Sequence, residues 1–313
     1  MKNLKQRLLL VLKGAAMGAA DVVPGVSGGT VAFITGIYRE LIETISGINI
    51  AAFRTLLKEG VPAFWKAING NFILALGVGM FLSIITLARI ISDLLQSNPV
   101  AVWAFFFGLV AASIPLVARR AEVWNAKAWF TFGLGAVAAF LVTELPVVED
   151  PGADWYLFIS GSVAICAMIL PGVSGSFILL LMGSYLTVLD AVNDRDFLKI
   201  AVFAAGAVFG LLSFSRVLKW MFNRYHDLTI AVLSGFLLGS LNKIWPWKNP
   251  LQSVVKHPGT DREKVVILEE EKVWPWNYFE LTGGDAILFE AVLLCLAGIA
   301  VIFAVDRLAA VKR

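Results

Sequence analysis

Charged residues are scarce in this chain of 313 residues. They make up 16% of it, whereas an ordinary soluble protein contains about 25%. Hydrophobic residues make up 58%, and apolar runs of about 20 residues recur along the chain. This composition excludes a soluble globular domain and predicts an all-α, polytopic membrane protein.

Cysteine and histidine are almost missing. Cys166 and Cys295 lie in apolar stretches without a CxxC spacing, which is typical of small buried hydrophobes. His226 and His257 fall in connecting segments, and two separated histidines do not build a typical metal site. We therefore expect no catalytic residue, no metal or other cofactor and no nucleic-acid partner.

The apolar residues form ten segments. The first continues into a break at Pro24 without a small-x-small cleavage site, so we expect it to be part of the folded protein. The segments are 8–23, 26–46, 71–92, 99–118, 127–143, 155–170, 174–190, 199–219, 228–245 and 285–305.

Two of these segments begin with nearly the same motif, PGVSGGT at 24–30 and PGVSGS at 171–176. Flanking glycines and tyrosines match at the same offset of 147, and a second block, with Arg89 and Arg216, matches at an offset of 127. The sequence therefore predicts two repeats, 1–143 and 144–313, with an insertion between residues 39 and 70 of the first.

Basic residues predict how the repeats are oriented. If the N-terminal side is inside, 16 basic residues fall inside and eight outside. The first repeat then enters from the inside and the second from the outside, as in many secondary transporters. We expect an inverted-topology repeat with both termini cytoplasmic.

Segments 8–23 and 155–170 are short for membrane spans. Sixteen helical residues reach ~24 Å, whereas the hydrocarbon core is about 30 Å thick. We therefore favour two re-entrant helical hairpins, 8–46 and 155–190, which turn at the PGVSG motifs, and about six full transmembrane helices. Two full spans in place of each hairpin would give the same sidedness.

Two further segments are amphipathic or polar. Segment 50–68 repeats apolar residues at helical spacing and predicts an amphipathic helix on the inner membrane surface or on a cytoplasmic loop. Residues 246–284 form an outer insert with a WPW motif near each end, and KVVIL within it suggests a strand pair.

Each motif is predicted to start a helix whose first amides lack intrahelical partners. An anion would satisfy several of them at once, helped by the helix dipole. We therefore predict a phosphate or carboxylate site at Ser27, Gly28, Gly29, Thr30, Ser174, Gly175 and Ser176. The alternative is that the small residues only allow close helix packing.

Few charged residues lie within the apolar segments. Arg89 and Arg216 coincide under the repeat, and each either binds phosphate or extends to the headgroups from a helix end. Asp21 precedes the first break, where it either carries a coupling proton or caps exposed amides. Glu290 has no evident partner.

The paired motifs DVVPGVSGGT and LPGVSGS, with this charge pattern, resemble the bacterial polyprenyl-phosphate transporter family over essentially the whole chain. The resemblance implies a bacterial cytoplasmic-membrane protein that returns undecaprenyl phosphate from the outer to the inner leaflet for cell-envelope synthesis. Its partners would be this lipid and other membrane lipids, and a homodimer stays open.

Two alternatives follow from the same motifs. PGVSGGT also resembles a motif of undecaprenyl-pyrophosphate phosphatases, but Gly28 and Gly175 stand where that motif has its arginine. No glutamate-rich first-helix motif and no histidine within a span accompany it. An anion channel would also suit deeply placed Gly/Ser loops, although no segment predicts a continuous pore.

Overall fold

The computed structural model describes residues 4–23, 26–256 and 264–310, and this part of the chain is mainly helical. The elements are α1 (Leu4–Val22), α2 (Gly28–Ile34), α3 (Tyr38–Ser46), α4 (Ile50–Glu59), α5 (Val61–Ala67), α6 (Gly70–Ser97), α7 (Pro99–Ala118), α8 (Ala126–Thr143), α9 (Asp154–Ile169), α10 (Gly175–Leu181), α11 (Ser184–Asn193), α12 (Phe197–Arg224), α13 (His226–Ser240), β1 (Lys248–Lys256), β2 (Lys264–Lys272), α14 (Pro275–Thr282) and α15 (Leu288–Ala310).

Five described helices, α6, α7, α8, α12 and α15, are long and apolar enough to cross a membrane. The bent pair α10 and α11 would make a sixth span if it is counted as one. These helices confirm the prediction of an all-α polytopic membrane protein. Of the segments expected to span fully, 228–245 forms the shorter helix α13, whose 15 residues reach only ~22 Å.

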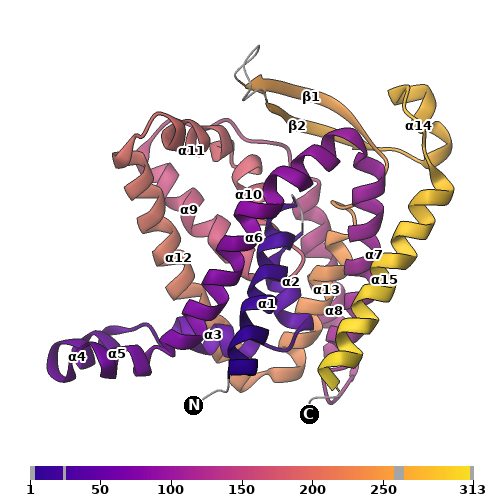
Figure 1. Ribbon diagram of the computed structural model, residues 1–313. Helices are drawn as coiled ribbons and strands as arrows, with labels where there is room; N and C mark the ends of the chain where they lie inside the picture. Colours follow the sequence, from indigo (N-terminus) through magenta and orange to yellow (C-terminus); the bar gives the residue numbers. More distant parts are fainter. Residues whose placement is uncertain (1–3, 24–25, 257–263, 311–313) are drawn as a thin grey trace.

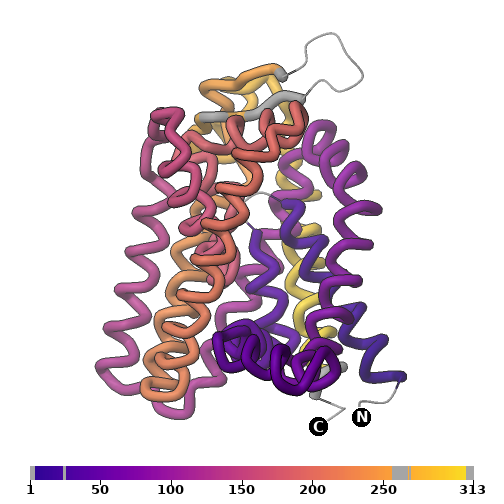
Figure 2. The backbone as a smooth tube through the Cα atoms, turned by 90° about the vertical axis from the view of Figure 1, so that its left-hand side faces the viewer, coloured from indigo at the N-terminus to yellow at the C-terminus, as the bar shows by residue number. Residues whose placement is uncertain are grey.

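The bundle has two distinct ends (Figure 1). The chain enters α1 and leaves α15 at one end, where α3, α4 and α5 also lie (Figures 1 and 2). The β-hairpin of β1 and β2 covers the other end, close to α11 (Figures 1 and 2). The first end is called the basic end below, because the segments predicted to lie inside are found there, and the second the hairpin end.

Segments 26–46 and 174–190 were each expected to form one continuous helix after the PGVSG motif, but each contains two helices, α2 and α3 in the first and α10 and α11 in the second. Gly36, with φ +76°, lies between α2 and α3, and Gly183, with φ +70°, lies between α10 and α11. Only glycine adopts this left-handed conformation at little cost. At the end of α2, the amides of Gly36 and Ile37 donate to Phe33 O and Ala32 O, so the last carbonyls of this helix are satisfied. The second pair of helices is bent by 110°.

Glycines that match between the predicted repeats lie at matching helix crossings. A Cβ on Gly14 would lie 2.2 Å from Leu76 O, where α1 crosses α6, and one on Gly161 would lie 2.5 Å from Phe203 O, where α9 crosses α12. These glycines let two backbones approach closely, as small residues do between membrane helices. Glycines that match in the sequence therefore occupy corresponding helix crossings, while the two repeats and their inverted topology stay predictions.

The predicted amphipathic helix 50–68 is two helices, α4 and α5. Gly60, with φ +84°, ends the first, and Pro62 stands in the first turn of the second, so one continuous helix was wrong. Phe53, Leu57 and Val61 are exposed, as expected for a face laid on a membrane surface.

The expected strand pair in the insert is confirmed. β1 and β2 are antiparallel, with Lys248 opposite Lys272 and Lys256 opposite Lys264. The tryptophans of the two WPW motifs contact one another, since the ring centroids of Trp245 and Trp274 are 5.8 Å apart. The hairpin is therefore closed at its base by aromatic packing.

Candidate functional site

The two PGVSG breaks meet inside the bundle. Ser27 Oγ lies 2.9 Å from Met168 O and 3.1 Å from Leu170 O, and its hydroxyl hydrogen is shared between these two carbonyls. The amide of Gly172 donates to Thr30 Oγ1 at 3.0 Å. Ser27 and Thr30 are completely buried. Segments more than 140 residues apart therefore form one polar centre among apolar side chains, in which side chains of the first break satisfy backbone groups of the second.

The amides of Gly28, Gly29 and Thr30, in the first break, already have hydrogen-bond partners within the described chain. Asp21 Oδ1 accepts a hydrogen bond of 2.7 Å from the Gly28 amide. The Gly29 amide donates to Ser27 Oγ at 3.1 Å, and the Thr30 amide to Ser27 O at 2.9 Å. A phosphate at Ser27, Gly28, Gly29 and Thr30 would therefore have to displace the Asp21 side chain.

Asp21 thus acts in this structure as a cap of the break, which is one of the two roles expected for it. Its second oxygen, Oδ2, is buried and has no hydrogen-bond partner among the described residues. A buried carboxylate with one free oxygen is costly when charged. The role in proton coupling is untouched by this contact and stays a prediction.

The second break is more open than the first. Met168 stands at the position that Asp21 occupies in the first repeat, and it offers no carboxylate to the amide of Gly175. Ser174 Oγ and Ser176 Oγ are 2.8 Å apart and bond to each other instead of capping α10. Gly175 and Ser176 are half-buried. Within the described residues, no hydrogen bond reaches the amide nitrogens of these two residues.

Arg216 lies toward the basic end, in the last turns of α12. Its Nη2 donates to Ile48 O, in the loop between α3 and α4, at 3.2 Å. It lines a polar pocket of about 520 Å³ with six other side chains: Ser46, Asn49, Lys219, Trp220, Asn223 and Arg224. Arg216 therefore lies in a basic pocket near the predicted inner surface, and no contact in the described chain joins it to either break.

Arg89 lies in the second half of α6, the helix that runs from the basic end to the hairpin end (Figure 1), and it is exposed. No hydrogen bond or ion pair of its side chain is found within the described chain. The structure therefore leaves Arg89 on the bundle surface and does not bring it to the breaks. Phosphate binding by either arginine stays a prediction.

Several charged residues were missed by sequence reasoning. Lys13 Nζ donates to Thr35 O at 2.7 Å and Arg120 Nη2 to Ile34 O at 3.1 Å, so two cations satisfy carbonyls at the end of α2. At the hairpin end, Lys243 and Lys248 share Glu270. The sequence did offer a signal for Lys243 and Lys248, because both lie in a segment predicted to be outside, where basic residues are disfavoured.

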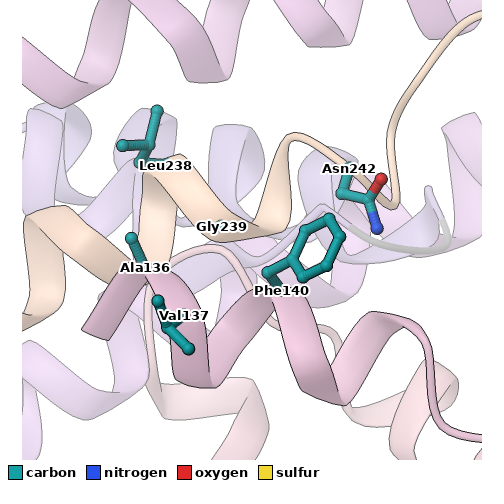
Figure 3. Close-up of a pocket in the computed structure, with 6 residues that line it drawn as sticks. All are labelled: Ala136, Val137, Phe140, Leu238, Gly239 and Asn242. Atoms are coloured by element: carbon teal, nitrogen blue, oxygen red, sulfur yellow. The ribbon is translucent and has the colours of Figure 1, made fainter. Parts of the chain in front are cut away.

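An apolar groove opens on the surface of the bundle (Figure 3). It lies between α8 and α13, has a volume of about 280 Å³ and is lined by Ala136, Val137, Phe140, Leu238, Gly239 and Asn242. Val137, Phe140 and Leu238 are exposed. Asn242 is the polar residue of the lining, and its Nδ2 donates to Thr143 Oγ1 and Glu144 Oε1, each at 2.6 Å.

Comparison with known proteins gives a consistent result. Residues 17–261 match the model of a family described as undecaprenyl phosphate translocase-like. A polyprenyl-phosphate transporter of Vibrio cholerae is 43% identical over 298 residues, which are 95% of this chain and 96% of that protein. A polyprenyl-phosphate transporter of Staphylococcus aureus is 32% identical over 257 residues, 75% of this chain and 85% of that protein. No solved structure matches the chain.

Proposed function

This chain belongs to the undecaprenyl phosphate translocase-like family, and we propose that it transports polyprenyl phosphate across the bacterial cytoplasmic membrane. The observation that carries this proposal is the meeting of two polar breaks within a bundle of apolar helices. Polyprenyl phosphate has a charged head and a long apolar tail. A route for it needs polar groups at membrane depth for the head and lipid-facing helices for the tail.

The second break supports phosphate binding better than the first. Its half-buried amides at Gly175 and Ser176 lack partners in the described chain, whereas Asp21 already occupies the first break. We propose that, of the two breaks, the head group reaches Ser174–Ser176 first and that displacement of Asp21 then opens Ser27–Thr30. This order makes the two breaks successive parts of one path.

We propose that transport runs from the outer to the inner leaflet. Under the predicted sidedness, the hairpin end faces outward and the basic end, with both termini, faces the cytoplasm. Arg89 would then lie on the outward part of the path and Arg216, in its basic pocket, on the inward part. A path that ends in a basic pocket is favourable for a phosphate dianion.

We also propose that Asp21 couples transport to a proton. Uptake of a proton would remove the charge of a buried carboxylate and weaken its hold on the Gly28 amide, which frees that amide for phosphate. The Gly28 amide would then bind the lipid phosphate in place of the Asp21 carboxylate. A structural cap alone would leave transport independent of this titration.

The curated relatives are transporters, and we propose that this chain likewise performs no hydrolysis. The described breaks supply hydroxyl groups and amides, and the side chain nearest to them with acid–base capacity is Asp21. Gly28 and Gly175 lack the side chain with which the phosphatase motif would hold a leaving phosphate.

Purified protein in liposomes tests the proposal. Labelled polyprenyl phosphate placed in one leaflet should appear in the other faster than in protein-free liposomes, and polyprenyl pyrophosphate should release no phosphate. Robust phosphate release would favour the phosphatase, and a flux of inorganic anions without lipid movement would favour the channel. No acceleration of lipid movement would refute the proposed transport.

A further inference from the structure

The register of the β-hairpin gathers charges on one of its faces. Lys248 stands directly opposite Lys272, and side chains two residues apart share a face of a strand, so Glu270 points the same way as Lys272. Two like charges directly opposite each other destabilise a hairpin. This pairing therefore needs anions close by, and Glu270 is the one supplied by the hairpin itself.

The lysines of this face share too few carboxylates. Glu270 Oε1 is 2.7 Å from Lys243 Nζ, at the end of α13, and 3.1 Å from Lys248 Nζ. Lys272 pairs separately with Glu144. One carboxylate thus serves two ammonium groups, and the group of Lys243, Lys248 and Glu270, called the lysine pair site below, carries an excess positive charge.

Burial makes this excess costly. The side chain of Lys248 is 7% exposed, and its Nζ lies 3.6 Å from the centroid of the Trp103 ring. Burial lowers the pKa of Lys248 from its usual 10.5 to about 8, against the opposing effect of Glu270. Burial alone would raise the pKa of Glu270, but Lys248 and Lys243 hold it below its usual range. A buried charge that is only partly paired is unfavourable unless a further anion reaches it.

The lysine pair site lies beside the second break. Lys243 Nζ is 4.4 Å from the centroid of the Phe177 ring, and Phe177 follows Gly175 by two residues. Gly172, in the same break, is packed against Ser240, three residues before Lys243. The lysine pair site and the open amides of the second break therefore lie in the same part of the bundle.

The groove between α8 and α13 lies next to the same end of α13. Asn242 ends the groove and immediately precedes Lys243 (Figure 3). Its apolar, exposed lining is the surface that the first isoprene units of a lipid would cover. Positive charge beside an apolar groove is the pattern that an amphiphilic phosphate requires.

We propose that Lys243 and Lys248 receive the phosphate group of polyprenyl phosphate at the hairpin end, where it takes the place of Glu270. Glu270 holds the two lysines together while no lipid is bound and leaves them when phosphate arrives. The exchange replaces a single negative charge with a phosphate that carries up to two, which better matches two ammonium groups. This inference rests on the proposed function.

The test measures binding to the full-length protein in nanodiscs, with polyprenyl phosphate and with inorganic phosphate as separate probes. Lys243→Gln and Lys248→Gln should each weaken binding of the lipid by about tenfold or more, because each removes a charge-assisted contact. Glu270→Gln should strengthen it several-fold, because the competing carboxylate is gone. If the groove also holds the tail, inorganic phosphate should bind more weakly than the lipid but respond to the same variants.

Matched controls lie on the same side of the protein. Lys199 pairs with Asp196 in the first turn of α12, and the exposed Glu269 precedes Glu270 on the hairpin. Lys199→Gln and Glu269→Gln should leave binding unchanged. Melting temperatures are recorded for all variants. If Lys248→Gln fails to fold, the binding measured for Glu270→Gln and for Lys243→Gln, at a half-buried position, decides the question.

Wild-type affinity in a folded Lys243→Gln variant, or weaker binding in Glu270→Gln, would overturn the inference and assign the lysines to holding the hairpin. In that case wild-type protein would still bind and move the lipid, so the proposed function would stand. If the wild-type protein binds neither probe, both the inference and the proposed function fail.

Discussion

Gly29 packs against the backbone just before the second break, and we predict that Gly29→Ala forces the two breaks apart. A Cβ at this position would lie 2.4 Å from Ile169 O and 3.1 Å from Met168 O. These are backbone atoms that cannot rotate away, and ordinary contacts of this kind exceed 3.4 Å. Relief therefore needs a shift of about 1 Å in one break. Overpacking of this kind costs about 1–3 kcal/mol.

The same shift would stretch the hydrogen bonds from Ser27 Oγ to Met168 O and Leu170 O. A typical hydrogen bond contributes about 1 kcal/mol. We therefore expect Gly29→Ala to melt at a lower temperature and to transport polyprenyl phosphate more slowly. Thermal unfolding in detergent and transport in liposomes measure the two effects.

Two variants serve as controls for Gly29→Ala. Gly77 lies in α6, where an added Cβ would meet no described atom within 4 Å beyond the neighbouring backbone of its own helix, so Gly77→Ala should retain both stability and transport. Ser176 is the repeat counterpart of Gly29 and already carries a side chain. Ser176→Gly loses the contact with Ser174 Oγ but forces no backbone shift, so it should lower the melting temperature less than Gly29→Ala does. The argument is refuted if Gly29→Ala melts and transports like Gly77→Ala.

Three further predictions concern charged groups. Asp21→Asn keeps an acceptor for the Gly28 amide, so it should melt near the wild type and flatten the pH dependence of transport. Asp21→Ala should lower the free energy of unfolding by about 1–3 kcal/mol. An unchanged pH profile in Asp21→Asn would exclude the coupling role. Arg89→Ala and Arg216→Ala should bind lipid phosphate ~10- to 150-fold more weakly, with the Lys variants intermediate, and unchanged affinity with lowered melting would assign both arginines to anchoring. The lowered pKa of Lys248, about 8, means that the folded protein releases this proton before the unfolded chain does. Its contribution to the free energy of unfolding should therefore rise between pH 8 and 10.5, by an amount on the order of a few kcal/mol, and the rise should be missing from Lys248→Met when melting is followed against pH.

The positions of the helices were predictable because they depend on local properties of the chain. Apolar runs long enough for a bilayer determined where α6, α7, α8, α12 and α15 lie. The extra breaks at Gly36 and Gly183 were missed, because an isolated glycine within an apolar run is compatible with a helix until its φ is known. The same holds for Gly60 between α4 and α5.

The repeated motif was predictable as a feature of the sequence, but its contacts were not. Its spacing indicated two comparable breaks with exposed amides, and the structure shows that they differ. Asp21 fills the first, and Met168 leaves the second without a carboxylate. An amide stays without a partner unless a side chain lies within hydrogen-bond distance of it. That distance is a property of the folded chain and cannot be read from the spacing of the motif.

The sequence by itself determined that this protein is a helical membrane protein with two matching breaks, because hydrophobic length and glycine-rich turns act through neighbours along the chain. Only the tertiary structure decided that Ser27 bonds to Met168 and Leu170, that Arg216 lies in a basic pocket, and that Lys243 and Lys248 share Glu270. These contacts join residues that are far apart in sequence. Their energies depend on burial and on angstrom-scale distances, and no periodicity of the chain records either quantity.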